Sequence, residues 1–441
     1  MLKKLPIGMQ TFENLIKGDC LYIDKTKYIH ELVKDVLIGN SSARYFLSRP
    51  RRFGKSLLVS TFDAIFSGKK ELFKGLWIYD NPEYDWEIYP IIKLDFGEIN
   101  NKGATNLTED LKLRLLQIAK KNELSLNINN NISACFRLLI QDLAEKHQKQ
   151  VVVLIDEYDK PIIDHLGKDI ELAKENRDML KSFYGVLKAQ DANLKFIFLT
   201  GVSKFSKVSV FSDLNNLEDL TMQEKYAGLL GYTEEELRLY FKENIEIFAK
   251  KQEMQEEILL VKIKEYYNGY RFSKGEVKVY NPFSILLLLK GYSFENYWFN
   301  SGTPTFLIDL LINNNETTEL AKLELKEVSA VTFNSYELDN LAILALLLQT
   351  GYLTIKRYNK EDDLYLLGYP NREVKESFLS YFLERTGKII LGSSRAQIVE
   401  LRNCLQNIEP DFEEIFDILR IFFANVPYEI QVSKERYYQS L

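Results

Sequence analysis

The sequence has few of the residues on which disulfide frameworks and zinc sites depend. Its 441 residues include only three cysteines, Cys20, Cys135 and Cys404, which are widely separated and have no CxxC spacing. This pattern favours a reducing compartment and argues against a disulfide framework or a structural zinc ion. The three histidines form no HxxxH or HExxH pattern, so we expect no histidine-based metal hydrolase.

Long apolar runs, a secretory leader and an excess of positive charge are also lacking. The longest apolar runs, near 341–348 and 285–289, fall far short of the ~20 residues that span a bilayer. No apolar segment follows the N-terminal lysines, so we expect no secretory signal. The net charge of −6 gives no global basic field, so any contact with DNA has to be local. These features predict a cytoplasmic protein of two or three globular domains with no membrane partner.

One short stretch, SRPRRFGKS at residues 48–56, has the pattern of a phosphate-binding loop. The apolar run before it predicts a buried strand, and residues 56–66 repeat apolar side chains at helical spacing. Unpaired N–H groups at a helix N-terminus stabilise phosphate oxygens. Lys55 would reach the β and γ phosphates of ATP, and the Ser56 hydroxyl would hold Mg²⁺. Arg49 stands where the usual pattern G-x-x-x-x-G-K-[ST] has its first glycine, so a chance turn is the alternative for this stretch alone.

A pair of acidic residues, Asp156 and Glu157, closes a continuous apolar run at 151–155. Such a run is typical of a strand buried on both faces of a parallel sheet. Asp156 would complete the Mg²⁺ shell opposite Ser56, and Glu157 would polarise the attacking water as a general base. A solvated acidic turn is the alternative for this pair alone. Together, the pair and the upstream loop predict an ATP site.

Two polar residues further along the chain are candidates for the same site. Thr200, at the tip of a predicted strand, is a candidate sensor of the γ-phosphate or its water, although threonine is a common strand residue. Arg271 is a candidate reporter on the nucleotide from above, with a turn arginine between helices as the more frequent alternative. The loop arginines are candidates to clamp phosphates, reach a neighbouring subunit or contact DNA, with solvated ion pairs as the alternative.

The predicted site residues fall into three overlapping groups. The nucleotide-binding group comprises Arg49, Pro50, Arg51, Arg52, Phe53, Gly54, Lys55, Ser56, Leu57 and Arg271. The catalytic group comprises Lys55, Glu157 and Thr200. The metal ligands are Ser56 and Asp156.

Strands and helices alternate through the first half of the chain. Predicted strands at 91–96, 151–155 and 194–201 join the one before the loop, and a fifth edge strand is expected within 217–222. A lead-in helix is expected at 28–33, and the helices expected between the strands lie at 56–66, 107–119, 132–146 and 172–187. This alternation predicts an α/β fold over residues 1–230, with the parallel sheet core of a P-loop NTPase.

Beyond residue 230 the predicted strands thin out. Helical patterns at 234–248, 256–267, 283–289 and 305–311 predict an all-α lid over residues 231–335, with Asn281 as an N-cap. A helix at 339–350, followed by strands at 352–355 and 364–367 around a polar turn, predicts a winged-helix-like α+β module over 336–390. Terminal helices are expected at 371–383, 396–405 and 412–423.

Six short motifs carry a resemblance that spans nearly the whole sequence. They are LPIG at 5–8, YIDKT at 22–26, RPRRFGKS at 49–56, DEYD at 156–159, TGVSK at 200–204 and YNGYRF at 267–272. With these motifs the protein resembles the bacterial AAA-ATPase-like family, whose members join an AAA-like (ASCE) P-loop ATPase to a C-terminal nuclease of the PD-(D/E)XK type. In that family arginine also replaces the first loop glycine. The resemblance implies ATP binding through Gly54, Lys55 and Ser56, with Asp156 and Glu157 in the metal and water roles.

The resemblance also bears on the C-terminal end. Family members continue into a nuclease domain with an Asp and an E-x-K set, and this sequence stops before such a set. We therefore expect residues 391–441 to be a helical linker and the start of a nuclease domain, without nuclease activity. The E-x-K pattern at 324–326 has no matching strand-borne Asp, so we expect it to be a solvated turn.

The function predicted from the sequence is Mg²⁺-dependent ATP binding and hydrolysis by an AAA-like ATPase that acts as a conformational switch or motor, in a DNA-linked defence or mobile-element process. A non-hydrolysing, nucleotide-dependent regulator that holds DNA or a protein is the alternative, and so is action on DNA through an associated nuclease subunit. A DNA or protein partner would bind the C-terminal region, and a homo-oligomer is compatible with either reading.

Overall fold

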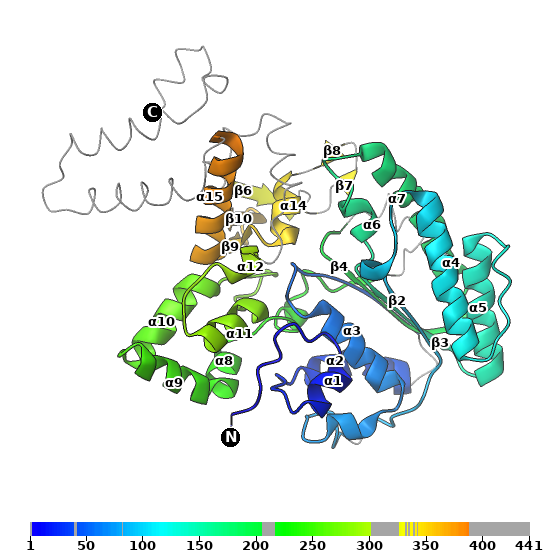
Figure 1. Ribbon diagram of the computed structural model, residues 1–441, viewed down its shortest axis with the longest axis horizontal. Helices are drawn as coiled ribbons and strands as arrows, with labels where there is room; N and C mark the ends of the chain where they lie inside the picture. The colour runs from blue at the N-terminus through cyan, green and yellow to red at the C-terminus, as the bar shows by residue number, and fades with distance from the viewer. Residues whose placement is uncertain are drawn as a thin grey trace, which may run out of the picture.

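A five-stranded parallel sheet forms the core of the protein (Figure 1). The structure is a computed structural model, and it describes residues 2–38, 42–81, 83–204, 217–300, 326–330, 333, 336–337, 340–341 and 343–387. The strand order is β2-β3-β4-β1-β5. The strands are β1 (Ala43–Ser48), β2 (Ile91–Asp95), β3 (Val151–Asp156), β4 (Leu194–Gly201) and β5 (Glu218–Asp219). The predicted α/β fold with a parallel, P-loop NTPase-like sheet is confirmed.

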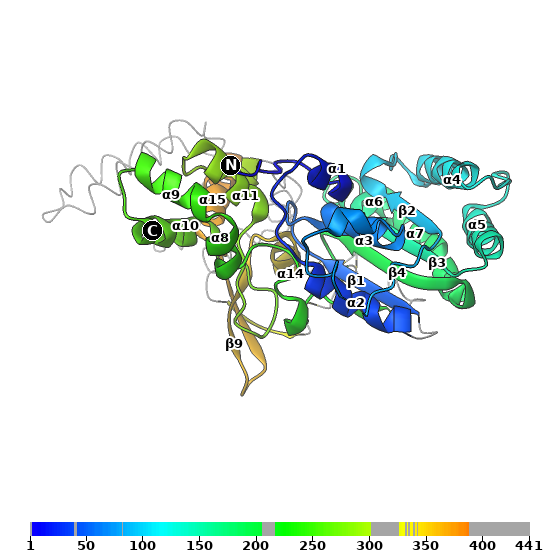
Figure 2. The ribbon, with the colours of Figure 1, turned by 90° about the horizontal axis from the view of Figure 1, so that it is seen from below.

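Helices pack against the sheet and bury its central strands. Every residue of β3 and β4 is buried, as expected for a parallel sheet between helical layers. Helix α3 (Lys55–Phe66) packs on β2, β3 and β4. Helices α4 (Ala104–Lys121), α5 (Ile132–His147) and α7 (Ile170–Ala189) pack against one another. Figures 1 and 2 show α4 and α5 at one end of the molecule, with α8 to α11 at the other.

The register of the strands brings several polar residues to one edge of the sheet. Thr200 on β4 is opposite Leu47 on β1. Asp95, the last residue of β2, is opposite Asp156, the last residue of β3. Since parallel strands end at the same edge, the loop after β1 and the acidic ends of β2 and β3 lie together, at the place where α/β sheets commonly bind ligands.

Four helices follow the sheet domain and bury a second apolar cluster. They are α8 (Glu234–Tyr240), α9 (Lys242–Lys251), α10 (Glu256–Tyr267) and α11 (Pro282–Gly291). The single helix expected at 234–248 is wrong, because the chain leaves helical geometry at Phe241, where a buried ring packs on Tyr232 with ring centroids 5.4 Å apart. The predicted cap of α11 is confirmed, since the Asn281 side chain accepts from the N–H groups of Phe283 and Ser284.

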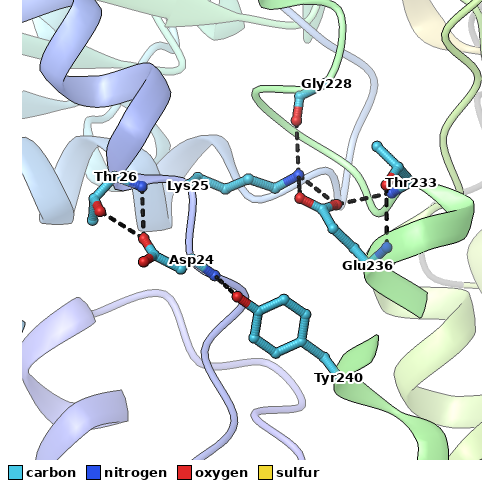
Figure 3. A network of polar contacts seen from close by, with 7 residues as sticks. All are labelled: Asp24, Lys25, Thr26, Gly228, Thr233, Glu236 and Tyr240. Atoms are coloured by element: carbon cyan, nitrogen blue, oxygen red, sulfur yellow. Dashed lines mark hydrogen bonds and ion pairs between the residues drawn. The ribbon is translucent and has the colours of Figure 1, made fainter. Parts of the chain in front are cut away.

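The N-terminal segment connects these helices to the sheet domain. It contains α1 (Phe12–Lys17) and α2 (Thr26–Ile38), and Leu5, Ile7, Leu21 and Ile23 pack into the second apolar cluster. Figure 3 shows Lys25, just before α2, reaching across to α8. Its Nζ donates to both carboxylate oxygens of Glu236 at 2.6 Å and to the carbonyl of Gly228 at 2.7 Å. Glu236 also completes a capping box with Thr233 at the start of α8.

A smaller sheet follows in the C-terminal part of the described chain. The strands β6 (Lys326–Ser329), β9 (Thr354–Asn359) and β10 (Leu364–Gly368) form an antiparallel sheet in the order β6-β10-β9, and Figure 2 shows its hairpin extending away from the body. The predicted hairpin is confirmed. Strand β6 lies inside the segment expected to be helical, and Lys326 belongs to it rather than to the expected turn. The rest of the E-x-K pattern, Glu324 and Leu325, lies outside the described residues.

Helices accompany this sheet. They are α12 (Tyr297–Asn300), α14 (Ile343–Thr350) and α15 (Arg372–Gly387). Helix α14 is shorter than the predicted 339–350, because residues 340–341 form β8 (Asn340–Leu341), which pairs with β7 (Tyr336–Glu337). The helices expected at 305–311, 396–405 and 412–423, and the segment 391–441, lie outside the described residues. Among the helices that the structure describes, none is both long and apolar enough to cross a membrane.

The remaining elements are short. They are α6 (Lys160–Ile163) and the 3-10 helices η1 (Lys70–Phe73), η2 (Phe96–Glu98), η3 (Asp191–Asn193) and η4 (Glu224–Tyr226).

Candidate nucleotide-binding site

The loop between β1 and α3 has the backbone geometry of an anion-binding turn. Gly54 takes φ +94° immediately before the first residue of α3, and Arg52 takes φ +67°. Glycine adopts this left-handed conformation without the steric cost that a Cβ brings. No side chain caps the N-terminus of α3. The N–H groups of its first turn are therefore not capped by a side chain, and a helix N-terminus of this kind attracts anions through its N–H groups and its dipole.

Lys55 is the first residue of α3, and its side chain reaches back to this loop. Its side chain is buried, and its Nζ donates to the carbonyls of Arg49 and Pro50, both at 3.0 Å. Burial lowers the pKa of Lys55, while the negative charges of Asp156, Glu157 and Asp159 oppose that shift. The ammonium group thus stands between the loop and the acidic end of β3, where a cation is needed to bind phosphate.

The pair Ser56 and Asp156 fits a magnesium ion. Asp156 is 3% exposed, and burial raises its pKa to about 6, partly offset by a hydrogen bond from Ser56 and by the charge of Lys55. A hydroxyl and a carboxylate that already touch are the hard oxygen ligands that Mg²⁺ prefers, with phosphate and water completing the shell. Within the described residues no group of three or more His, Cys, Asp or Glu side chains could hold a metal ion alone.

Glu157 has an unusual backbone conformation. Its φ is +50°, and its N–H donates to the Asp156 carboxylate at 3.0 Å. A residue with a side chain seldom takes this left-handed conformation, and such positions cluster at functional sites. The turn directs the Glu157 side chain to the cavity that Lys55 also lines.

The cavity has a volume of about 400 Å³ and is open to solvent on one side; it is lined by the phosphate loop, the segment from the end of β3 through α6, the N-terminal segment and the helical region. The phosphate loop and the end of β3 supply its polar wall, with Arg51, Arg52, Gly54, Lys55, Ser56, Leu57 and Glu157. The N-terminal segment supplies Pro6, Gly8, Met9 and Gln10, and the helical region supplies Tyr232, Phe283 and Leu286. An adjoining cavity of about 80 Å³ shares Pro6, Leu57 and Tyr232 and is otherwise mainly apolar.

Several of the predicted site residues do not line this cavity, among them Arg49, Pro50, Phe53, Thr200 and Arg271. Thr200 is buried, and its hydroxyl donates to the carbonyl of Leu47 at 2.8 Å, within the sheet. Arg271 is also buried and bonds to carbonyls of Ser273, Lys274 and Lys356. Neither side chain lines the 400 Å³ cavity.

Arg49, the residue in place of the first glycine, also points away from the cavity. Its guanidinium donates to the carbonyls of Thr221 and Tyr226 and lies 4.2 Å from the ring centroid of Phe272. Burial lowers its pKa to about 9. The arginine therefore anchors the back of the loop, which explains why a large side chain is accommodated at a position usually held by glycine.

The structure adds two carboxylates to those selected from the sequence. Asp159 is buried near Lys55, and its Oδ2 accepts from the N–H groups of Val202 and Ser203, which fixes the chain after β4. Asp95 ends β2 as Asp156 ends β3. That repetition at the end of a predicted strand was the available sequence signal for Asp95, whereas the contacts of Asp159 with the β4 loop are visible only in three dimensions.

Comparison with known proteins agrees with this geometry. The model of a family described as a predicted AAA-ATPase matches residues 6–211. The chain is 37% identical over 438 residues to an uncharacterized protein encoded in the vnfD 5′ region of Azotobacter chroococcum mcd 1, covering 97% of this chain and 78% of that protein.

Proposed function

Because this chain belongs to the predicted AAA-ATPase family, we propose that it binds ATP together with Mg²⁺ in the 400 Å³ cavity and hydrolyses it. One observation carries the proposal: Lys55 and Ser56 at the start of α3 share one polar site with Asp156 and Glu157 at the end of β3. A cavity of this size suits a nucleotide. Its phosphate end is the loop, and the apolar walls at Tyr232 and the adjoining 80 Å³ cavity suit the base.

The chemistry follows from the positions of these side chains. The N–H groups of α3 and the Lys55 ammonium hold the β and γ phosphates, in the manner of phosphate loops. Bound Mg²⁺, held by Ser56 and Asp156, would neutralise charge on the phosphate oxygens. Glu157 takes a proton from a water molecule whose oxygen attacks the γ phosphorus, and the bond from the γ phosphorus to the β–γ bridging oxygen breaks to leave ADP and phosphate.

Steady-state ATP hydrolysis with three variants tests the proposal. We expect Lys55→Ala to lose nucleotide binding, and Glu157→Gln to keep binding while its kcat falls by about 10²–10⁴-fold. Glu171→Gln, at a side chain that is 76% exposed on α7, is the matched control and should behave as wild type. If wild type binds ATP but turns it over no faster than Glu157→Gln, the protein is instead a nucleotide-dependent regulator.

We further propose that the nucleotide state acts as a conformational switch. The support is that the phosphate loop touches the helical region directly: the Phe53 ring packs on Tyr270 and Phe272, with centroids 4.9 and 5.5 Å away, and Arg52 lies over the ring of Phe283. A DNA-linked defence or mobile-element process is the setting we propose for this switch, on the family resemblance alone.

A further inference from the structure

Asp95 stands beside the catalytic carboxylates without a role in the proposed reaction. Its backbone is in register with Asp156 across β2 and β3. Its Oδ1 accepts from the N–H of Gly97 at 2.8 Å, which starts the short helix η2. That hydrogen bond occupies one carboxylate oxygen and leaves the other available to a ligand.

Gly97 is the point at which Asp95 and Glu157 meet. A Cβ placed on Gly97 would lie 2.9 Å from Oδ1 of Asp95 and 2.8 Å from Oε2 of Glu157. Both carboxylates therefore lie close to Gly97, and the absence of a side chain at residue 97 leaves room for them. Two like charges this close are stabilised when a hydrogen-bond donor such as water lies between them.

A second cavity, of about 290 Å³, lies beside Asp95. Ser56, Asp95 and Asp156 line it together with Gln10, Glu98 and Arg114. Ser56 and Gln10 also line the 400 Å³ cavity, so the two cavities adjoin at the proposed metal pair Ser56 and Asp156. Mg²⁺ usually keeps several of its waters when it binds to a protein, and this polar space has room for them.

Resting on the proposed function, we propose that Asp95 is a positioning residue for hydrolysis: it accepts a hydrogen bond from water of the magnesium shell and keeps Glu157 turned toward the attacking water. Residues that hold the outer shell of a metal site typically contribute 10–100-fold to metal affinity or activity.

The test compares Asp95→Asn with wild type. Asparagine keeps the oxygen that accepts from Gly97 and so preserves the cap of η2, but it removes the charge. We expect kcat to fall 10–100-fold while KM for ATP stays within about threefold, and the Mg²⁺ concentration at half-maximal hydrolysis to rise. A second readout does not depend on activity: the melting temperature of the complex with a non-hydrolysable ATP analogue, measured as Mg²⁺ is added. We expect Asp95→Asn to need 10–100-fold more Mg²⁺ than wild type for the same stabilisation.

Two further variants make the outcome decisive. Asp110→Asn is the matched control, since Asp110 also accepts from a backbone N–H, that of Asn100, but lies outside both cavities. Gly97→Ala leaves every charge in place and separates the carboxylates sterically, so it should lower kcat as well. If Asp95→Asn retains the wild-type kcat and Mg²⁺ midpoint while Glu157→Gln is inactive, Asp95 has no such role and the ATPase assignment stands. If wild type itself does not hydrolyse ATP, the proposed function fails with it.

Discussion

At the scale of single residues, Glu373 is a buried acid outside the catalytic site. It has no exposed surface, and its carboxylate accepts from the Ser284 hydroxyl at 2.9 Å and from the N–H of Trp298 at 2.6 Å. Burial raises its pKa to about 8, and these two hydrogen bonds only partly offset the rise. The side chain therefore joins α11, α12 and α15 as a neutral carboxylic acid near pH 7.

This acid predicts a stability that falls as the pH rises. Between the ordinary pKa of 4.5 and the folded value of about 8, the folded chain holds a proton that the unfolded chain has released, so deprotonation favours unfolding. A difference of one in pKa between the folded and unfolded states corresponds to about 1.4 kcal/mol. We expect the melting temperature of Glu373→Gln relative to wild type to increase steadily from pH 5 to pH 8.5. Thermal melts of Glu376→Gln, on the same helix, are the control, and an equal trend there would contradict the assignment.

Arg49 illustrates which residue roles a motif can and cannot predict. The sequence pattern located the loop, because Lys55 and Ser56 must follow a strand and open a helix for phosphate to bind there. It could not tell which way the arginines point, since that depends on carbonyls far away in the chain, at Thr221 and Tyr226. Thr200 was correctly predicted near the end of a strand. The sequence could not show that its hydroxyl donates to the carbonyl of Leu47, because that contact depends on the pairing of β4 with β1.

At the scale of elements, the network in Figure 3 fixes how the N-terminal segment and α8 meet. Lys25 is 8% exposed, and burial lowers its pKa while the charge of Glu236 opposes the shift. Removing one partner of a buried ion pair leaves the other uncompensated, which typically costs 3–5 kcal/mol. The same segment continues back to Pro6 and Gln10 in the nucleotide cavity.

We therefore predict that Lys25→Met lowers the free energy of unfolding by about 3 kcal/mol. The double variant Lys25→Met with Glu236→Gln should be less destabilised than the sum of the single variants, because the unpaired charge is gone while glutamine can still accept from Thr233. Urea denaturation measures both. Lys225→Met, at the more exposed pair with Glu31, should cost no more than about 1 kcal/mol. Strict additivity in the double variant would show that the pair does not act as a unit.

Elements were predictable where local pattern and tertiary packing agree. The runs that became β3 and β4 are apolar because both faces are buried, so their sequence alone reveals them. Helix α10 has the predicted bounds 256–267. The break at Phe241 and the strand β6 were missed because each depends on a distant partner, the Tyr232 ring for one and β10 for the other.

At the scale of the whole molecule, the phosphate loop is held by parts of the chain more than 200 residues away. The indole Nε1 of Trp298 donates to the carbonyl of Arg51 at 3.0 Å. Gly351, after α14, has φ +91°, and a Cβ there would lie 2.8 Å from the Pro50 ring. The backbone of the phosphate loop is thus in contact with the C-terminal elements.

This contact predicts that nucleotide binding changes the hydrogen exchange of the C-terminal elements. Any shift of residues 50–53 on binding phosphate must move Trp298 or break its hydrogen bond, and coupling between two sites is reciprocal. In hydrogen exchange, we expect a non-hydrolysable ATP analogue to protect 343–369 in wild type and much less in Trp298→Phe, which keeps an aromatic ring against Tyr352 but loses the N–H donor. Loss of one such hydrogen bond should cost only about 1 kcal/mol, so the variant remains folded. Trp77→Phe, at a side chain that is 45% exposed, controls for the substitution itself. Equal protection of 343–369 in wild type and Trp298→Phe would contradict the prediction, because it would show that the Trp298 hydrogen bond does not couple the loop to the C-terminal elements.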